Sequence, residues 1–168
     1  MSFRDFEQTI ASSELRHVAR HWNDRRGSRK LPGWSDIQPS LIAAQLPIIW
    51  SYKYDRVSDS FIGRLAGDKI ERMFGKSFRG SPMNEIYPKE DFPILFARSK
   101  RVVCEPALFR GEGMVFKHID RLGRGERIIL PLADDGVAGD GLLGVTQYQL
   151  VDGVPSADDS ERESWFPL

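Results

Sequence analysis

The sequence predicts an α+β domain: an antiparallel sheet with helices over one face. Three observations favour this class. Residues 48–66 contain two β-rich runs around a polar turn, residues 67–103 have a helical pattern, and residues 106–150 hold short extended runs between glycine-rich turns. Because the turns are short, neighbouring strands should run antiparallel. The helical stretch between the two halves of the sheet is then expected to cover it.

The first expected element is an amphipathic helix in the stretch SSELRHVARHWNDRRG. An apolar stripe with i, i+3, i+4, i+7 spacing is formed by Leu15, Val18, Ala19 and Trp22. We therefore treat residues 1–27 as an N-terminal helical segment. Its residues Leu15, Val18 and Trp22 are candidates for a dimer contact with a symmetry mate. Packing of this helix on its own sheet is an equally open alternative.

Residues 28–47 are broken by prolines and leave room for one short helix at residues 40–45. The predicted hairpin follows. Trp50 and Tyr52 share one face of its first strand, and Phe61 and Leu65 continue a single period-2 face in its second.

The helical stretch contains Gly75-Lys76-Ser77, which resembles the end of a phosphate-binding loop. Such a loop needs glycine at both ends and a helix that begins at the Lys-Ser pair, so that backbone amides meet phosphate. Here Ile70 occupies the first glycine position, and the predicted helix precedes Gly75. We interpret Gly75 as a helix stop and predict no nucleotide site.

Further helices are expected from Ser81-Pro82 to Ile86 and from about Lys89 to Val103. Residues 108–150 contain the extended runs Leu108–Arg110, Val115–Arg121, Arg127–Leu132 and Leu142–Leu150, from which we expect about three strands. With the two strands of the hairpin, the sheet would have five. Residues 28–150 then form the main domain. The acidic, serine-rich residues 151–168 are expected to be a mobile tail.

Composition narrows the possible functions. The 168 residues include 24 Lys and Arg and 24 Asp and Glu, so no overall field attracts nucleic acid or an anionic membrane. Basic clusters at residues 25–30, 98–101 and 121–127 are interleaved with acidic residues or lie on outer faces, and we interpret them as solvated surface. The charged N-terminus and the single cysteine, Cys104, favour a cytoplasmic protein without disulfides.

Two groups of residues are candidates for a catalytic or metal site. His17 and His21 stand four residues apart on the first helix, with Asp24 nearby, but the glutamate of an HExxH motif is missing. Cys104 and His118 would form a thiol–imidazole pair only if their elements were neighbours. We predict no metal site and no catalytic residue, and keep a metal-dependent enzyme using His17/His21 as a lesser alternative.

Aromatic and apolar side chains of the predicted sheet and helices suggest a cleft. The candidate ligand-binding residues are Trp50, Tyr52, Phe61, Leu65, Phe96 and Phe116. Aromatic residues line small-molecule pockets between a sheet and its helices. The same residues are also needed simply to bury the sheet, so a core without a ligand is the alternative.

A series of short motifs spans residues 20–150, including FIGRLAG at residues 61–67. Its pieces, in order, are Trp22, Gly27, Leu31-Pro32, Asp36-Ile37, Pro39, Leu46-Pro47, Arg64, Gly67, Gly75, Pro131-Leu132 and Gly136. This order resembles the PAS domain, specifically a divergent branch of short, stand-alone proteins abundant in alphaproteobacteria. The resemblance implies a five-stranded sheet, and sensing or protein–protein signalling rather than catalysis.

PAS domains bind haem, flavin or small metabolites between the central helices and the sheet, or bind nothing and dimerise. The resemblance therefore leaves the cofactor unknown. We predict a sensory or regulatory domain that is not an enzyme and acts through protein–protein interaction, as a homodimer or on an unidentified signalling protein. A small ligand in the cleft could gate it. The alternative is a small-molecule-binding module without a signalling partner; neither nucleic acid nor a membrane is expected as a partner.

Overall fold

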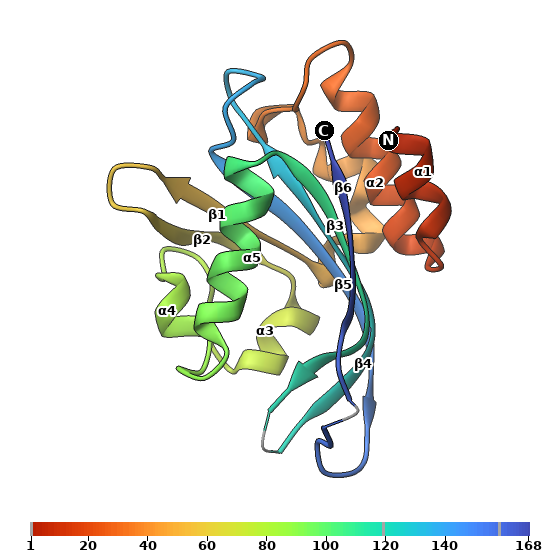
Figure 1. The fold of residues 1–168 in the computed structure, drawn as a ribbon, viewed down its shortest axis with the longest axis vertical. Coiled ribbons are helices and arrows are strands. Elements are labelled where there is room, and N and C mark those ends of the chain that lie inside the picture. The colour runs from red at the N-terminus through yellow and green to blue at the C-terminus, as the bar shows by residue number, and fades with distance from the viewer. Residues whose placement is uncertain (1, 119, 158) are drawn as a thin grey trace.

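The computed structural model describes residues 2–118, 120–157 and 159–168 and confirms the α+β class (Figure 1). The described strands form one antiparallel sheet in the order β2-β1-β5-β4-β3-β6. The strands are β1 (Ile49–Asp55), β2 (Ser60–Ala66), β3 (Ala107–Lys117), β4 (Leu122–Leu132), β5 (Gly141–Val151) and β6 (Arg162–Pro167). The expected hairpin is the β1–β2 pair, and the sequence halves on either side of the helices join through β1 and β5.

Helices cover both faces of this sheet (Figure 1). One face carries α3 (Asp68–Phe74), α4 (Met83–Ile86) and α5 (Phe92–Cys104). The other carries α1 (Phe3–Thr9) and α2 (Ser13–Arg26), together with the 3-10 segments η1 (Trp34–Asp36) and η2 (Pro39–Ile48). The sequence predicts helices over one face and an amphipathic N-terminal helix; the structure places that helix on the opposite face.

Neighbouring strand residues alternate between two apolar layers. Leu108 and Ile128 pack under α1 and α2, whereas Phe109 and Ile129 pack under α3 to α5. Trp22 ties the N-terminal layer to the sheet, because its indole N–H donates to the carbonyl oxygen of Pro131 at 2.8 Å. Both faces are therefore core, and space for a ligand must lie where the helices leave the sheet incompletely covered.

The expected count of five strands and the expected mobile tail need correction, because Arg162–Pro167 forms the edge strand β6 against β3. Phe166 packs on Phe6, with ring centroids 5.3 Å apart, and Trp165 packs on Phe109 on the other face at 4.9 Å. An edge strand has one solvated side and needs few apolar residues. The charged stretch RESWFP therefore lacks the apolar pattern by which strands are recognised.

Leu65 does not share a face with Phe61, contrary to the sequence prediction. Tyr52 pairs with Gly63 and Ser51 with Leu65, so the register shifts and Arg64 is an extra residue in β2. A bulge of this kind reverses the alternation beyond it. Leu65 consequently packs against the N-terminal layer, whereas Phe61 belongs to the layer under α3 to α5.

Local signals at the helix ends agree with the structure. Ser12 caps α2 by accepting a hydrogen bond from the Leu15 amide, and Gly27 ends it at φ 57°. Gly75 ends α3 in the left-handed conformation, φ 64°. The Gly75-Lys76-Ser77 stretch thus follows the carbonyl end of a helix, as predicted. Within the described ranges, no helix combines the length and apolar character that crossing a membrane requires.

Candidate functional site

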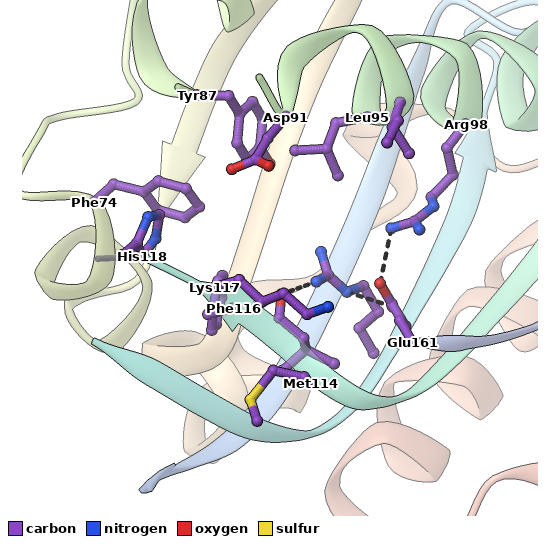
Figure 2. A pocket seen from close by; sticks show the side chains of 13 residues that line it. Phe74, Tyr87, Asp91, Leu95, Arg98, Met114, Phe116, Lys117, His118 and Glu161 are labelled. Carbon is purple, nitrogen blue, oxygen red and sulfur yellow. Dashed lines mark hydrogen bonds and ion pairs between the residues drawn. The ribbon is translucent and has the colours of Figure 1, made fainter. Parts of the chain in front are cut away.

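A cavity of about 220 Å³ lies between the first half of α5, the C-terminal end of β3 and the middle of β4 (Figure 2). We call it the arginine pocket. It is lined by Phe74, Tyr87, Asp91, Ile94, Leu95, Arg98, Met114, Val115, Phe116, Lys117, His118, Arg127 and Glu161. Its volume corresponds to that of about seven water molecules, at about 30 Å³ each. The pocket is thus suited to a small organic molecule.

Arg127 of β4 forms the floor of the pocket and is only 5% exposed. Its guanidinium donates a hydrogen bond to the carbonyl oxygen of Val115. Its Nε lies 2.8 Å from Oε1 of Glu161, and its guanidinium carbon lies 5.5 Å from the centre of the Phe116 ring. Burial lowers the pKa of Arg127 from its ordinary value. An arginine remains charged in a protein, so β4 carries a buried positive charge to the pocket.

Arg98 comes from α5 on the opposite wall and is 7% exposed. Its Nη1 lies 3.2 Å from Oε2 of Glu161, and its Nη2 donates to Oε1 of Glu163 at 2.6 Å. The guanidinium carbon lies 4.5 Å from the ring centre of Phe109. The two arginines thus share Glu161 as the one carboxylate that both contact among the described residues.

The hydrogen-bonding capacity of this cluster is not saturated. Nε of Arg98 is buried and has no hydrogen-bond partner among the residues that the structure describes. The contacts of both arginines with Glu161 are ion pairs by distance, without the geometry of hydrogen bonds. Buried guanidinium groups favour planar, bidentate acceptors. Arg98 already has a hydrogen-bonded carboxylate in Glu163, so the donors left for a better-placed carboxylate are Nε and Nη1 of Arg98 and Nε of Arg127.

The remaining wall is aromatic. Phe74 contacts the rings of Tyr87, Phe116 and His118 edge to face, at centroid distances of 5.1, 5.5 and 5.3 Å. Burial lowers the pKa of His118, which keeps its imidazole neutral near pH 7. Its buried Nε2 has no hydrogen-bond partner within the described ranges. The pocket therefore has one end with two arginines and a carboxylate, and an aromatic end at which Asp91 also lies. The arginine end suits the carboxylate of a small amphipathic molecule.

Of the six aromatic and apolar residues proposed from the sequence for the cleft, Phe116 alone lines the arginine pocket. Trp50, Tyr52 and Phe61 are buried in the layer under α3 to α5. Phe96 packs on Phe61 at 5.8 Å and is half-buried, and Leu65 lies on the other face. Most of these residues therefore belong to the packed core, which was the alternative to a ligand-binding cleft.

Tyr52 illustrates how fully that core is packed. Its ring contacts Trp50, Phe61 and Phe78, with centroids 6.0, 6.4 and 5.5 Å away. The side chain is completely buried, and burial raises the pKa of its phenol. The middle of the sheet-to-helix space is therefore filled by the protein's own aromatic side chains.

The other candidates also lie in structural positions. Leu15, Val18 and Trp22 are 0% exposed within the chain, so these side chains present no surface to a second copy. His21 accepts a hydrogen bond from the Gln38 amide at its Nε2, 3.1 Å away, and Nε2 of His17 contacts the carbonyl oxygen of Leu41. In the described part of the chain, no group of three His, Cys, Asp or Glu residues is arranged to hold a metal ion.

Cys104 and His118 do not form the pair considered from the sequence. Cys104 ends α5 and lies near Arg56, with Nη1 of Arg56 3.9 Å from its sulfur. His118 lines the pocket near Asp91, at the other end of the same helix. Thirteen helical residues span about 20 Å, so the two groups are far apart.

Arg98 and Arg127 belong to the basic clusters predicted to be solvated surface, and Glu161 belongs to the predicted mobile tail, so the sequence prediction does not include them in a site. One signal could have found the arginines. Arg98 lies three residues after Leu95 and four before Val102, and thus in the apolar stripe of α5. Arg127 shares a strand face with Ile129. A charge at a core-facing position indicates a buried site.

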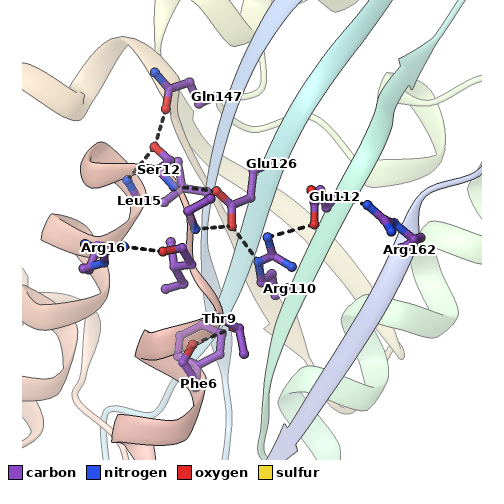
Figure 3. A network of polar contacts seen from close by, with 12 residues as sticks. Phe6, Thr9, Ser12, Leu15, Arg16, Arg110, Glu112, Glu126, Gln147 and Arg162 are labelled. Atoms are coloured by element: carbon purple, nitrogen blue, oxygen red, sulfur yellow. Dashed lines mark hydrogen bonds and ion pairs between the residues drawn. The ribbon is translucent and has the colours of Figure 1, made fainter.

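A second polar network lies on the opposite face of the sheet (Figure 3). The carboxylate of Glu126 accepts hydrogen bonds from the amides of Ala11 and Ser12, at 3.0 and 2.8 Å, and from Arg110 at 2.6 Å. Arg110 also contacts Glu112 at 3.0 Å. The charges of this network are paired with one another, and it anchors the junction of α1 and α2 to β4. We interpret it as structural.

Comparison with protein families places this fold among known ones. A family model described as PAS domain matches residues 10–147, most of the chain. No curated protein matches the sequence. The matched range includes Arg98 and Arg127 but ends before Glu161 and β6.

Proposed function

Because this chain belongs to the PAS domain family, we propose that it is a sensory or regulatory module that binds a small organic carboxylate in the arginine pocket. The family supports a sensory, regulatory or ligand-binding role in general and is not typically catalytic. We infer that the domain acts in the cytoplasm by contacting a signalling protein or a second copy. A single cysteine that is free in the structure fits such a reducing compartment.

The observation that carries the proposal is the pair of buried guanidinium groups, Arg98 and Arg127, on facing walls of one cavity. Two buried cations require anionic partners, since an unpaired charge in a protein interior is costly. A carboxylate fits this requirement because it accepts two parallel hydrogen bonds from one guanidinium. Phe74 and Phe116 supply the apolar contact for the rest of the ligand.

The size of the cavity limits the ligand. Pockets for drug-sized molecules usually enclose about 300–1,000 Å³, more than this cavity. A monocyclic or short-chain acid is therefore the expected class, and benzoate is a suitable probe. Benzamide has nearly the same shape without the charge and serves as its control.

Calorimetric titration with benzoate and benzamide tests the proposal. Benzoate should bind and benzamide should not, and Arg127→Gln should lower benzoate affinity at least about tenfold, since a charged hydrogen-bond partner is lost. Arg124→Gln, at a more exposed arginine of the same strand, is the matched control and should leave affinity unchanged. The proposal fails if the wild-type protein binds none of acetate, benzoate and hexanoate, and native mass spectrometry of the freshly purified protein detects no bound small molecule.

A further inference from the structure

Glu161 belongs to the C-terminal segment yet reaches into the arginine pocket (Figure 2). It lies just before β6, beyond the range matched by the family model. Its side chain is 10% exposed and contacts Arg98 at 3.2 Å and Arg127 at 2.8 Å. The carboxylate that both arginines contact is thus supplied by a segment beyond the range matched by the family model.

Gly111 makes this reach possible. On β3 it pairs with Arg127 of β4 on one side and with Glu163 of β6 on the other. A Cβ atom at Gly111 would lie 1.9 Å from Oε1 of Glu161 and 2.7 Å from its carboxyl carbon. The missing side chain leaves a gap in the face of β3, and the Glu161 side chain crosses the strand through it to reach Arg127.

We propose that Glu161 is a tethered carboxylate that occupies the arginine pair when no ligand is bound, and that an incoming organic acid displaces it and loosens β6 from β3. This inference rests on the function proposed above. The ligand and Glu161 both carry a carboxylate, and both bind the guanidinium groups of Arg98 and Arg127. They therefore compete, and binding in the pocket becomes coupled to the edge of the sheet.

Because Glu161 is attached to the chain close to the arginines, a free carboxylate must bind strongly enough to displace it. A group held by a short segment acts at an effective concentration in the millimolar range. Acetate offers only the carboxylate and should displace Glu161 poorly, whereas benzoate also gains contact with Phe74 and Phe116. Removing Glu161 should raise the apparent affinity of every carboxylate, because the competing state disappears.

The hold on β6 depends in part on this contact. β6 is an edge strand with a single partner, β3, and its pairing covers Ala107 to Glu112. Arg162 and Glu163 are exposed, so the charged half of the strand contributes little apolar burial. Releasing Glu161 leaves the hydrogen bond from Arg98 to Glu163 as the remaining contact of this half with α5, and should increase local opening there.

Rescue by acetate tests whether the arginine pair accepts a free carboxylate in place of Glu161. Glu161→Ala should lower the melting temperature by about 5–10 °C, because it leaves the buried Arg127 without a carboxylate partner and Arg98 with Glu163 alone. Sodium acetate at 100 mM should return about 3 °C more than equal concentrations of sodium chloride or acetamide. Glu105→Ala, at an exposed glutamate, should show neither effect. Equal stabilisation of the wild-type protein, Glu161→Ala and Glu105→Ala by acetate would overturn the inference.

Hydrogen exchange measured by mass spectrometry tests the release of β6. Saturating benzoate should make the β6 amides of the wild-type protein exchange about tenfold faster, while those of β1 stay protected. Gly111→Ala keeps the carboxylate in the chain but fills the gap it crosses, and should give faster β6 exchange without benzoate. It should also bind benzoate several-fold more tightly than the wild-type protein.

The outcomes separate this inference from the proposed function. If benzoate binds the wild-type protein and β6 protection is unchanged, the displacement is wrong while the carboxylate site stands. If acetate rescues Glu161→Ala but the wild-type protein binds no carboxylate, the site is permanently filled by Glu161 and displacement is again wrong. If neither protein responds to a carboxylate, both proposals fail.

Discussion

The carboxylate of Glu161 lies over Gly111 so closely that a Cβ atom there would come within 1.9 Å of its Oε1. A side chain from the C-terminal segment thus occupies the space that a side chain at Gly111, in the middle of β3, would fill. This contact brings Glu161 to Arg127, on the next strand, and fixes the charge balance of the arginine pocket.

Arg127→Met should lower the free energy of unfolding by about 3 kcal/mol, because Glu161 loses one of its two buried partners. The double variant Arg127→Met/Glu161→Gln should lose less than the sum of the single variants, since no buried carboxylate remains to be paired. Urea denaturation of the four proteins measures this coupling. Arg124→Met on the same strand is the control. Additive losses would show that the pair does not interact.

Gly144→Ala should destabilise the protein by about 2–4 kcal/mol, because an added Cβ would lie 2.1 Å from the Trp50 indole ring. Trp50 cannot turn away freely, since its Nε1–H donates to Oγ1 of Thr146 at 2.9 Å. Denaturation followed by tryptophan fluorescence measures the loss. Gln149→Ala, exposed on the same strand, should change stability by less than about 0.5 kcal/mol. Equal effects of the two substitutions would contradict the packing described here.

Trp22→Phe should cost about 1–2 kcal/mol of stability without changing the oligomeric state. The substitution removes the N–H that donates to Pro131 and leaves that buried carbonyl without this partner. Thermal denaturation and light scattering measure the two properties. A shift from dimer to monomer on this substitution would instead place Trp22 in a subunit contact, as first considered from the sequence.

Acid should weaken the contact between α2 and the segment before η2. Burial, followed by the nearby charge of Arg25, lowers the pKa of His21, which accepts a hydrogen bond from the Gln38 amide through Nε2. The folded state therefore binds this proton less readily than the unfolded state, whose pKa is about 6.5. The stability contributed by neutral His21 is present above pH 6.5 and is lost as the pH falls below it.

His21→Gln should make the loss of stability between pH 7.5 and pH 5.5 smaller, because glutamine can accept the same hydrogen bond and does not titrate. Urea denaturation at the two pH values checks this, with His17→Gln on the exposed side of α2 as control. An unchanged pH dependence in the His21 variant would show that this imidazole does not control the acid response.

The parts of the fold that could be predicted from the sequence are those set by neighbours along the chain. The apolar spacing of Leu15, Val18 and Trp22 identifies α2, and Gly75 marks the end of α3. The short turns between strands indicate antiparallel pairing, as observed. Each of these features depends on interactions within a few residues.

The parts that could not be predicted depend on contacts between distant segments. The extra residue Arg64 in β2 becomes visible only when the register with β1 is known. Arg98, Arg127 and Glu161 meet because α5 crosses β4 and the C-terminal segment crosses β3. No local pattern links three such positions, although a charge in the apolar stripe of α5 is a usable sign of burial.

The edge strand β6 pairs only with β3, and the ion pairs of Glu161 with Arg98 and Arg127 help to hold the start of β6 in place. If these ion pairs break and β6 separates from β3, the amide and carbonyl groups of Ala107–Glu112 that face β6 lose their partners and become accessible to solvent. Unpaired strand edges readily accept another extended segment. Binding of an acid in the pocket would then expose a strand edge, that of β3, to which another extended segment can pair.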